Sequence, residues 1–430
     1  MANELLQWLD SRIFFGIKLG LGQTRELFQR LGDPDKKLKF IHTAGSNGKG
    51  STGAFLESCL RACSFTTGMY SSPHLVTPNE RFLLQGKSVK DERLFPVMEK
   101  VRNAAKEMEK EGKKVTYFEC TTAIAALLFA EEKADYVIWE TGMGGRLDST
   151  NIVTPIASVI TTISLEHREH LGDTLEKIAG EKAGIIKENV PCFVGPGVGK
   201  EALAVIRKKA EELHAPLFRV APEDVPSCGQ LLWENGRLLQ YLPTGRAIPL
   251  AGAHQRSNAA LADKVLTFLA GQGVRLPADK IEEGFRNTFW PARFQFFPEE
   301  DLIVDGGHNP ECAQILANTL KELFPGRKFD FIYGSFADKE WNKVLEILSP
   351  FAASFTFVPV GSERKNADPS EMFAFFSSTF PGIPACCKTS LKEALAGKGE
   401  EKRILCGSLH LAGAYYELRG LDPFETRNRP

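Results

Sequence analysis

The sequence has little of what marks a membrane protein, a secreted protein or a nucleic-acid-binding protein. Its longest fully apolar run, Ala123–Ala130, is far shorter than the roughly 20 residues that span a bilayer. The N-terminus carries acidic residues early and lacks the charged-then-apolar layout of a signal peptide. The net charge of −1 argues against an extended basic face for nucleic acid. These absences predict a cytoplasmic protein that binds neither a membrane nor nucleic acid.

Cysteine and histidine are also too sparse and too scattered for a structural metal centre. The nine cysteines include no CxxC pair, and the eight histidines form no cluster with zinc-finger spacing. We therefore expect reduced structural thiols and no structural zinc.

The length and the patterning predict two α/β domains. At 430 residues the chain is too long for one ordinary core. Short apolar runs alternate with longer amphipathic ones, which is typical of α/β layering. We predict two open, mostly parallel sheets, in a larger N-terminal domain (residues 1–295) and a smaller C-terminal domain (residues 299–430). Asn-Gly and Thr-Gly turns within residues 223–252 predict a small β excursion inside the first domain. The expected helices include 52–62, 93–110, 121–132, 175–186, 200–213 and 259–269.

The stretch FIHTAGSNGKGST, residues 40–52, has the composition of a phosphate-binding loop. Its glycines let successive backbone N–H groups point at one anion, Lys49 adds charge, and a helix N-terminus follows. The strict GxxxxGK[ST] pattern is not met, because Thr43 replaces the first glycine and Gly50 follows the lysine. A plain tight turn is the alternative. The position between a predicted strand and a predicted helix favours phosphate binding.

Two further polar side chains follow predicted strands. Glu140 ends the strand in DYVIWE, where open α/β sheets place ligand-contacting groups, and a carboxylate near phosphates suits Mg²⁺. An acid at a strand end is equally common on structural grounds, so both interpretations stay open. His167 follows another predicted strand and could face the same crevice.

The next predicted helix carries a lysine on its apolar face. Asp173 and Glu176 form a capping-box-like pair, and the apolar stripe of the helix runs to Lys182. Such a lysine usually extends its ammonium to water along a half-buried stem. If it is buried instead, its pKa falls, and the neutral amine can take up CO2 to form a metal-binding carbamate. The residues alone favour the first interpretation.

A second strand-end site is expected in the C-terminal domain. In LIVDGGHNP, Asp305 ends a strand and His308 follows, while Asn309 and Pro310 suit an ordinary helix start. Nucleotide would then sit between the two domains, a frequent place for ligand sites.

Taken in order, these motifs resemble one family. The matching stretches are AGSNGKGS, YSSPH with NERF, ETGMGGRLDSTN, HREHLGDTLEKIAGEKAGIIK, HQRSNAALA, WPARFQ, DGGHNP and GSFADK. They are similar to those of folylpolyglutamate synthase/dihydrofolate synthase, in the Mur ligase superfamily of ATP-dependent amide-forming ligases, over nearly the whole chain. The resemblance implies a P-loop-type central domain followed by a Rossmann-like C-terminal domain.

The resemblance also implies a role for each matching residue. ATP would be held by Asn47, Gly48, Lys49, Gly50, Ser51, Asn258, Arg293 and Asp305, with His308 beside the site. Mg²⁺ would be held by Ser72, Glu140 and His167. Lys49, Glu140, His167 and Lys182 would form the catalytic group. Lys182 matches a lysine that is carbamylated in this family, which reverses the preference given above, and Asp148 lies in a segment tied to pterin binding.

The implied reaction joins L-glutamate to a folate or dihydropteroate carboxylate through an acyl phosphate, with ATP as the phosphate donor. Attack by an anion on an anion needs cations between them, which Lys49 and Mg²⁺ would supply. We expect a monomer, because the sequence has no heptad region.

The C-terminal motifs depart from the family pattern. Phe336 stands for a usual leucine, Gly307 for a usual alanine, and SERKNADP lacks an expected PRA run. These departures leave open a Mur ligase for a different acid acceptor. A nucleotide-binding protein without ligase chemistry is a further alternative, against which the intact Lys49, Glu140 and His167 argue.

Overall fold

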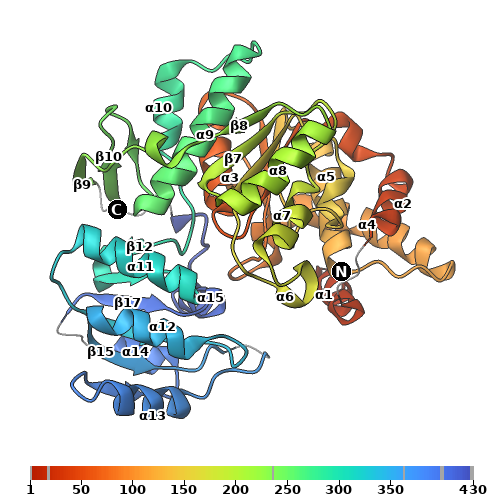
Figure 1. Ribbon diagram of the computed structural model, residues 1–430. Helices are drawn as coiled ribbons and strands as arrows, with labels where there is room; N and C mark the ends of the chain where they lie inside the picture. The colour runs from red at the N-terminus through yellow and green to blue at the C-terminus, as the bar shows by residue number, and fades with distance from the viewer. Residues whose placement is uncertain (1, 17–19, 235–236, 362–363, 398–400, 427–430) are drawn as a thin grey trace. The chain divides into compact units, whose positions relative to one another are not determined.

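The computed structural model describes residues 2–16, 20–234, 237–361, 364–397 and 401–426 (Figure 1). The chain forms two compact units. The N-terminal unit comprises residues 1–74, 78–226 and 257–288, and the C-terminal unit comprises residues 75–77, 227–256 and 289–430. The sequence predicts a domain boundary near residue 295, whereas the structure divides the chain after residue 288. The small β segment, which the sequence assigned to the first domain, groups with the C-terminal unit instead.

The N-terminal unit is built on an eight-stranded sheet of order β4-β3-β2-β5-β1-β6-β7-β8. Its strands are β1 (Phe40–Ala44), β2 (Thr67–Tyr70), β3 (Phe82–Leu84), β4 (Lys87–Ser88), β5 (Tyr136–Glu140), β6 (Ala157–Thr162), β7 (Cys192–Gly197) and β8 (Leu217–Arg219). The six strands from β2 to β8 in this order pair in parallel, whereas β3 pairs antiparallel with β2 and β4. Central strands β1 and β5 are buried throughout, which explains why they read as continuous apolar runs.

Helices cover both faces of this sheet. They are α1 (Ala2–Asp10), α2 (Gly22–Arg30), α3 (Lys49–Ala62), α4 (Asp91–Lys110), α5 (Tyr117–Glu131), α6 (Arg168–Leu171), α7 (Leu175–Ala183), α8 (Lys200–Glu212), α9 (Ala253–Gly271) and α10 (Ala278–Arg286). Right-handed crossovers place α3 on one face and α5, α7 and α8 on the other, because the chain moves in opposite directions along the sheet. Helix α10 packs on α3, and the Ser58 hydroxyl donates to the carbonyl of Gly284 over 2.8 Å.

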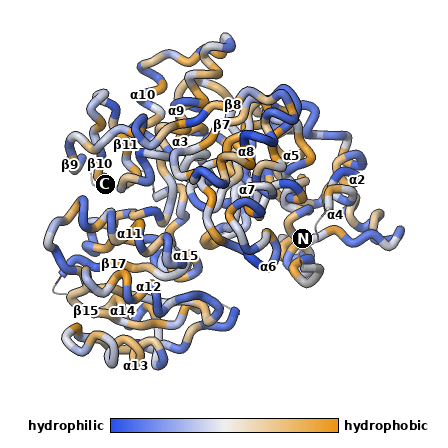
Figure 2. Tube along the Cα trace, in the orientation of Figure 1, coloured by the Kyte–Doolittle hydropathy of each residue, from blue (hydrophilic) through white to orange (hydrophobic). Residues whose placement is uncertain are grey.

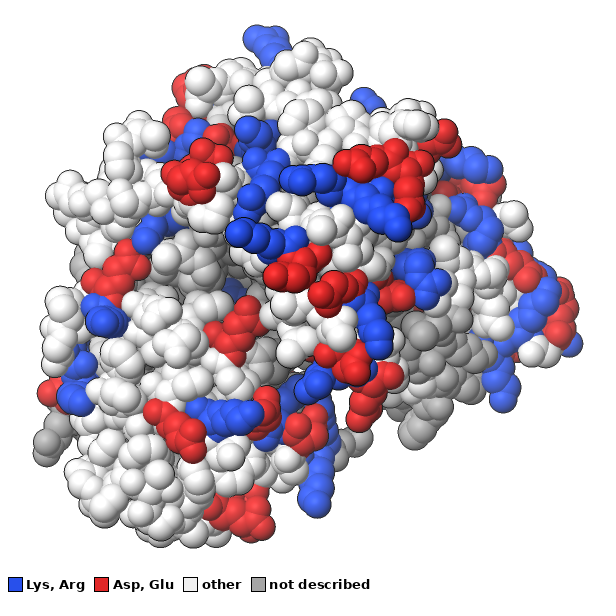
Figure 3. Space-filling model, viewed as in Figure 1, with Lys and Arg blue, Asp and Glu red and all other residues white. Residues whose placement is uncertain are grey.

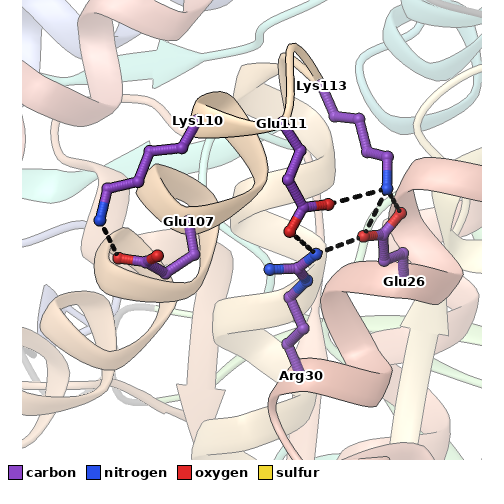
Figure 4. Close-up of polar contacts among 6 residues, drawn as sticks. All are labelled: Glu26, Arg30, Glu107, Lys110, Glu111 and Lys113. Atoms are coloured by element: carbon purple, nitrogen blue, oxygen red, sulfur yellow. Dashed lines mark hydrogen bonds and ion pairs between the residues drawn. The ribbon is translucent and has the colours of Figure 1, made fainter.

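Four charged side chains connect α2 to the segment after α4 (Figure 4). Arg30 lies 2.6 Å from both Glu26 and Glu111. Lys113 contacts the same two carboxylates over 2.9 and 3.0 Å. Each cation therefore bridges both anions, a geometry that stabilises more than isolated surface pairs do.

The C-terminal unit contains two sheets. The three-stranded sheet, of order β11-β10-β9, is antiparallel and consists of β9 (Gln230–Glu234), β10 (Arg237–Tyr241) and β11 (Ala247–Ile248). The six-stranded sheet, of order β12-β13-β17-β14-β15-β16, is parallel except for β12. Its strands are β12 (Gln295–Phe297), β13 (Leu302–Val304), β14 (Phe329–Tyr333), β15 (Ala352–Phe357), β16 (Ala385–Cys387) and β17 (Arg403–Cys406). Its helices are α11 (Pro310–Leu323), α12 (Trp341–Leu348), α13 (Pro369–Thr379), α14 (Leu391–Ala396) and α15 (Leu409–Leu418).

The predicted α/β class, with two mostly parallel sheets, is confirmed. Hydrophobic residues gather along the strands and the helix faces that pack on them, whereas outer loops are hydrophilic (Figure 2). Lysine and arginine are interspersed with aspartate and glutamate on the face shown in Figure 3. Among the described residues, no helix is both long and apolar enough to span a membrane.

Candidate active site

The glycine-rich loop joins β1 to α3 and is tied to the end of β6. Ser46 N donates to the carbonyl of Thr162, and Asn47 N donates to the Thr162 hydroxyl, each over 2.9 Å. The Thr161 hydroxyl donates back to the carbonyl of Asn47 over 2.6 Å. At Gly45 a Cβ would lie 1.9 Å from Oγ1 of Thr161, so only glycine fits there. Since its backbone is held from outside, the loop is preorganised.

Lys49 is the first residue of α3, so its side chain starts at the N-terminus of that helix. Its Nζ donates to the carbonyl of Gly45 over 2.8 Å, so the side chain crosses the loop that precedes it. Gly48, the N-cap, has a φ of 87°, in the left-handed region that favours glycine. A lysine ammonium and a helix N-terminus on one loop form a suitable site for phosphate.

The three predicted metal ligands are Ser72, Glu140 and His167. Each lies at or beyond the end of a strand, and these strands end at the same edge of the sheet. Thr43 on β1 lies level with Glu140 on β5, and Tyr70 on β2 lies level with Trp139. Ser72, two residues after Tyr70, therefore lies close to the level of Glu140 along the strands. Glu140 is buried, with 5% of its surface exposed. His167 lies beyond the end of β6, the other neighbour of β1. The phosphate loop and these strand ends share one edge because the strands are parallel.

The chemistry of these donors fits Mg²⁺. The hydroxyl of Ser72 and the carboxylate of Glu140 beside a phosphate loop suit Mg²⁺, which takes one or two carboxylates and completes its shell with phosphates and water. The imidazole of His167 is a less usual ligand for this ion. Among the described residues, no three His, Cys, Asp or Glu side chains gather as a metal-binding group.

Lys182 is buried and paired. Its side chain is 1% exposed, and its Nζ donates to Oε1 of Glu166 over 2.6 Å. Burial, with the nearby charge of Lys49, lowers the pKa of Lys182 to about 8 against the opposing pull of Glu166. Burial raises the pKa of Glu166, but Lys182 and Lys49 outweigh it and hold that pKa below its usual value. The interpretation of Lys182 as a lysine that extends to water is wrong.

Asp148 holds its own loop together. Its carboxylate accepts from the backbone N–H of Met143 over 2.8 Å and from that of Thr150 over 3.0 Å, and it caps the short 3₁₀ helix Ser149–Ile152. Burial raises the pKa of Asp148, although these hydrogen bonds oppose the shift. The carboxylate therefore fixes the ETGMGGRLDST segment that follows β5.

Asn258 on α9 packs against the phosphate loop. A Cβ added at Gly48 would lie 2.5 Å from Oδ1 of Asn258, and Asn258 is 6% exposed. The structure thus brings together a helix from residues 253–271 and a loop some 200 positions earlier in the sequence.

The remaining predicted residues cluster in the C-terminal unit at the carboxyl end of β13. Asp305 accepts from the backbone N–H of Phe294 over 3.0 Å and from that of Gly307 over 2.8 Å. A Cβ at Gly306 would lie 2.9 Å from Nη1 of Arg293, so the arginine lies over the same turn. Burial and the charges of Lys339 and Arg293 lower the pKa of His308 to about 4, which keeps its imidazole neutral at pH 7.

The sequence matches the Mur ligase middle domain over residues 43–265, just over half of the chain. It is 36% identical over 387 residues to dihydrofolate synthase/folylpolyglutamate synthase of Bacillus subtilis, covering 86% of this chain and 89% of that protein. The chain belongs to this family of Mur ligases.

Solved structures of family members agree with the fold. Folylpolyglutamate synthase of Mycobacterium tuberculosis, complexed with ADP and AMPPCP, matches with a TM-score of 0.85 and 27% identity over 98% of both chains. Escherichia coli FolC in complex with DHPP and ADP matches with a TM-score of 0.80 and 29% identity over 97% of both chains. Enzymes of this Mur ligase family are ATP-dependent ligases.

Sequence reasoning missed two parts of this Mur ligase site. Glu166, the partner of Lys182, directly precedes His167, and its position one residue before a predicted ligand was the available signal. Thr161 and Thr162 hold the phosphate loop but read only as strand residues. Their role depends on β6 pairing with β1, which no local pattern reveals.

Proposed function

We propose that this Mur ligase joins L-glutamate to a carboxylate of dihydropteroate or folate, using ATP and passing through an acyl phosphate. The observation that carries the proposal is the buried Lys182–Glu166 pair beside Lys49 of the phosphate loop. Similarity to folylpolyglutamate and dihydrofolate synthases over most of the chain supports the choice of substrates.

In the first step a substrate carboxylate oxygen attacks the γ-phosphorus of ATP, and ADP leaves. Both reactants are anionic, so positive charge must lie between them. Lys49, held across its loop, would supply one such charge. The amides of Gly48, Lys49 and Gly50 would orient the phosphates, with Asn47 and Ser51 beside them. The amine of glutamate then attacks the acyl carbon, releases phosphate and leaves an amide.

Ser72, Glu140 and His167 would hold Mg²⁺, which when bound neutralises phosphate charge. The carboxylate of Glu140 and the hydroxyl of Ser72 both offer hard oxygen ligands.

Lys182 has the environment that a carbamate needs at its formation. Its amine is neutral in a substantial fraction near pH 8, attacks CO2 through nitrogen, and loses one proton to solvent. The product carries one negative charge where an ammonium stood, so Lys49 would then stabilise the group that it now repels.

Asn258, Arg293, Asp305 and His308 would contact the nucleotide, while Asp148 would position the loop after β5 for the pterin rather than contact it. We also propose that the N-terminal unit is an ATP-binding ligase domain, that the C-terminal unit is the C-terminal ligase domain, and that the protein is a monomer.

Phosphate release tests the function. Purified protein with ATP, Mg²⁺ and glutamate is assayed in parallel with dihydropteroate and with tetrahydrofolate. Stimulation by both indicates a bifunctional enzyme, and stimulation by one indicates a dedicated synthase. No release above the control without acceptor would reject both substrates.

The second candidate is a Mur ligase for another acid, favoured by the C-terminal departures. Phe336, which stands for the usual leucine, is buried. Arg364 lies 4.7 Å above its ring, and the ring of His410 packs against it. The side chains around this position therefore pack on an aromatic ring and not on a leucine. A panel of acids in which only a non-pterin acid stimulates turnover would establish that function instead.

A further inference from the structure

His42 is a buried histidine that the proposed mechanism does not use. It lies in the middle of β1, the strand that leads into the phosphate loop, and none of its surface is exposed. Burial and the charge of Lys187 lower the pKa of His42 to about 3, so the imidazole is neutral at pH 7. The ring therefore carries a single N–H, on one of its two nitrogens.

The polar neighbours of the ring assign that proton to Nε2. Nε2 of His42 lies 3.0 Å from Oγ1 of Thr150, and the same hydroxyl donates to Oδ1 of Asp148. Both carboxylate oxygens of Asp148 also accept backbone N–H groups, one from Thr150 and one from Met143, so this carboxylate acts as an acceptor. A hydroxyl has one proton to donate, which leaves the oxygen of Thr150 to accept from His42. Nε2 of His42 is therefore the donor, and Nδ1 carries no proton.

Two neighbouring strands hold Thr150 in this way. His42 on β1 is level with Trp139 on β5. Nε1 of Trp139 donates to the carbonyl of Thr150 over 3.0 Å, while His42 donates to its hydroxyl. Thr150 lies in the short 3₁₀ helix Ser149–Ile152 and is fully buried. The sheet thus fixes both the backbone and the side chain of Thr150, and the hydroxyl proton is directed at Asp148.

Asp148 passes this restraint to the loop that follows β5. The loop comprises residues 141–148 and directly follows Glu140. It includes three glycines, of which Gly144 has a φ of 67°, so its backbone has many alternative conformations unless something holds it. The Asp148 carboxylate holds it by accepting from the backbone N–H of Met143 over 2.8 Å. The proposed function places the pterin of the acceptor at this loop.

Packing alone does not explain a histidine at position 42. Nδ1 of His42 has no hydrogen-bond partner among the residues that the structure describes, and a buried acceptor without a partner costs free energy. A leucine would fill a similar volume without that cost. What a leucine lacks is the N–H that reaches Thr150.

We propose that His42 is a positioning residue, whose Nε2–H orients the Thr150 hydroxyl towards Asp148 and thereby holds residues 141–148 in the conformation that binds the acid acceptor. It acts on acceptor binding without touching the acceptor. All of these residues lie in the N-terminal unit. The inference rests on the acceptor part of the proposed function and adds to it a residue of the strand that carries the phosphate loop.

The test compares the KM for dihydropteroate and for tetrahydrofolate in wild-type protein, His42→Leu and His42→Gln. Leucine removes the donor, whereas the amide nitrogen of glutamine can take the place of Nε2. We expect the acceptor KM to rise roughly 3- to 10-fold in His42→Leu and to stay within about twofold of wild type in His42→Gln. ADP affinity, measured by isothermal titration, should be unchanged in both variants, because Thr161 and Thr162 hold the phosphate loop.

A second variant removes the other partner of the same hydrogen bond. Thr150→Val deletes the hydroxyl and keeps the shape of the side chain, so it should raise the acceptor KM as well. The double variant with His42→Leu should be no worse than the worse single one, since both changes remove the same contact. Ser158→Ala is the matched control, because Ser158 is buried, is level with His42 on β6 and donates instead to the carbonyl of Ile185. It should leave the acceptor KM unchanged.

Hydrogen exchange at the amides of Met143 and Thr150, measured without substrate, reports the loop directly. Exchange should be faster in His42→Leu and unchanged in His42→Gln. His42→Leu with lower thermal stability but unchanged KM and unchanged exchange would show a merely structural role and overturn the inference, as would a His42→Gln variant as impaired as His42→Leu. Wild-type protein that releases no phosphate with either acid would reject the proposed function, while exchange at these amides would still decide the role of His42, so the two failures are distinguishable.

Discussion

Replacing Lys182 with methionine should make the protein more stable while removing its activity. An ammonium with 1% of its side chain exposed is costly to bury, and the fall of its pKa from 10.5 to about 8 corresponds to roughly 3 kcal/mol. Methionine fills a similar volume without charge. The pKa of about 8 already includes the hydrogen bond to Glu166, but the variant leaves that carboxylate without this partner, at a cost of about 1–3 kcal/mol. The net gain in the free energy of unfolding at pH 7 is therefore about 0–2 kcal/mol.

The pH dependence of this difference has a definite sign. Between pH 8 and pH 10.5 the unfolded chain keeps a proton on Lys182 that the folded protein has released. The free energy of unfolding of the wild type therefore rises through this window, relative to the variant. The advantage of Lys182→Met should be largest below pH 8 and should have shrunk by roughly 3 kcal/mol at pH 10.5.

Urea unfolding in CO2-free buffer at several pH values measures both effects. Lys177→Met is the matched control, because Lys177 lies on the same helix, is 62% exposed and pairs with Asp173. It should change neither the stability nor its pH dependence appreciably. If Lys182→Met unfolds more easily than the wild type at pH 7 and their difference is flat up to pH 10.5, the account of a depressed pKa is refuted.

Three further predictions follow from the phosphate loop and the surface. Lys49→Ala should nearly abolish phosphate release while the circular dichroism spectrum stays unchanged, because the lysine supplies charge and not packing; activity within a fewfold of wild type would contradict the loop assignment. Gly48→Ala should lower the free energy of unfolding by about 1–3 kcal/mol in urea titrations and weaken ADP binding, because φ is 87° and the new Cβ would approach Asn258. Arg30→Met should lower the melting temperature at low salt, and the loss should vanish in 1 M NaCl, roughly the salt at which surface charges are screened; a loss that persists at high salt would contradict an electrostatic role (Figure 4).

Much of the fold was predictable because parallel strands buried on both faces leave long apolar runs. Strand β5 (Tyr136–Glu140) and strand β1 (Phe40–Ala44) were predicted for this reason. Element boundaries were less accurate. The helix expected from residue 52 begins at Lys49, so the lysine is part of the helix N-terminus.

The start of α7 differs by one residue from the predicted cap. The sequence predicts a capping pair of Asp173 and Glu176, but Thr174 is the cap, and its hydroxyl accepts from Lys177 N over 3.3 Å. Asp173 instead pairs with the side chain of Lys177. Both residues are good caps, and the local pattern did not choose between neighbours one position apart.

The contacts that define the site are mostly long-range, and sequence patterns do not encode them. The burial of Lys182 depends on packing across β6 and α7, whereas its helical position alone suggested partial exposure. The contact of Asn258 with Gly48 and the attachment of the loop to Thr161 depend on which strands and helices become neighbours. The family resemblance identified Lys182, Asn258 and Gly48 but not Thr161, and the structure supplies the physical setting of all four.

The most direct test of the central claim is the fate of a labelled carboxylate oxygen. Dihydropteroate or tetrahydrofolate with ¹⁸O in its reactive carboxylate is turned over with ATP, Mg²⁺ and glutamate, and the released phosphate is analysed by mass spectrometry. Activation of the acid as an acyl phosphate predicts that each phosphate carries one ¹⁸O atom from the substrate. Turnover that yields phosphate without the label would contradict the account.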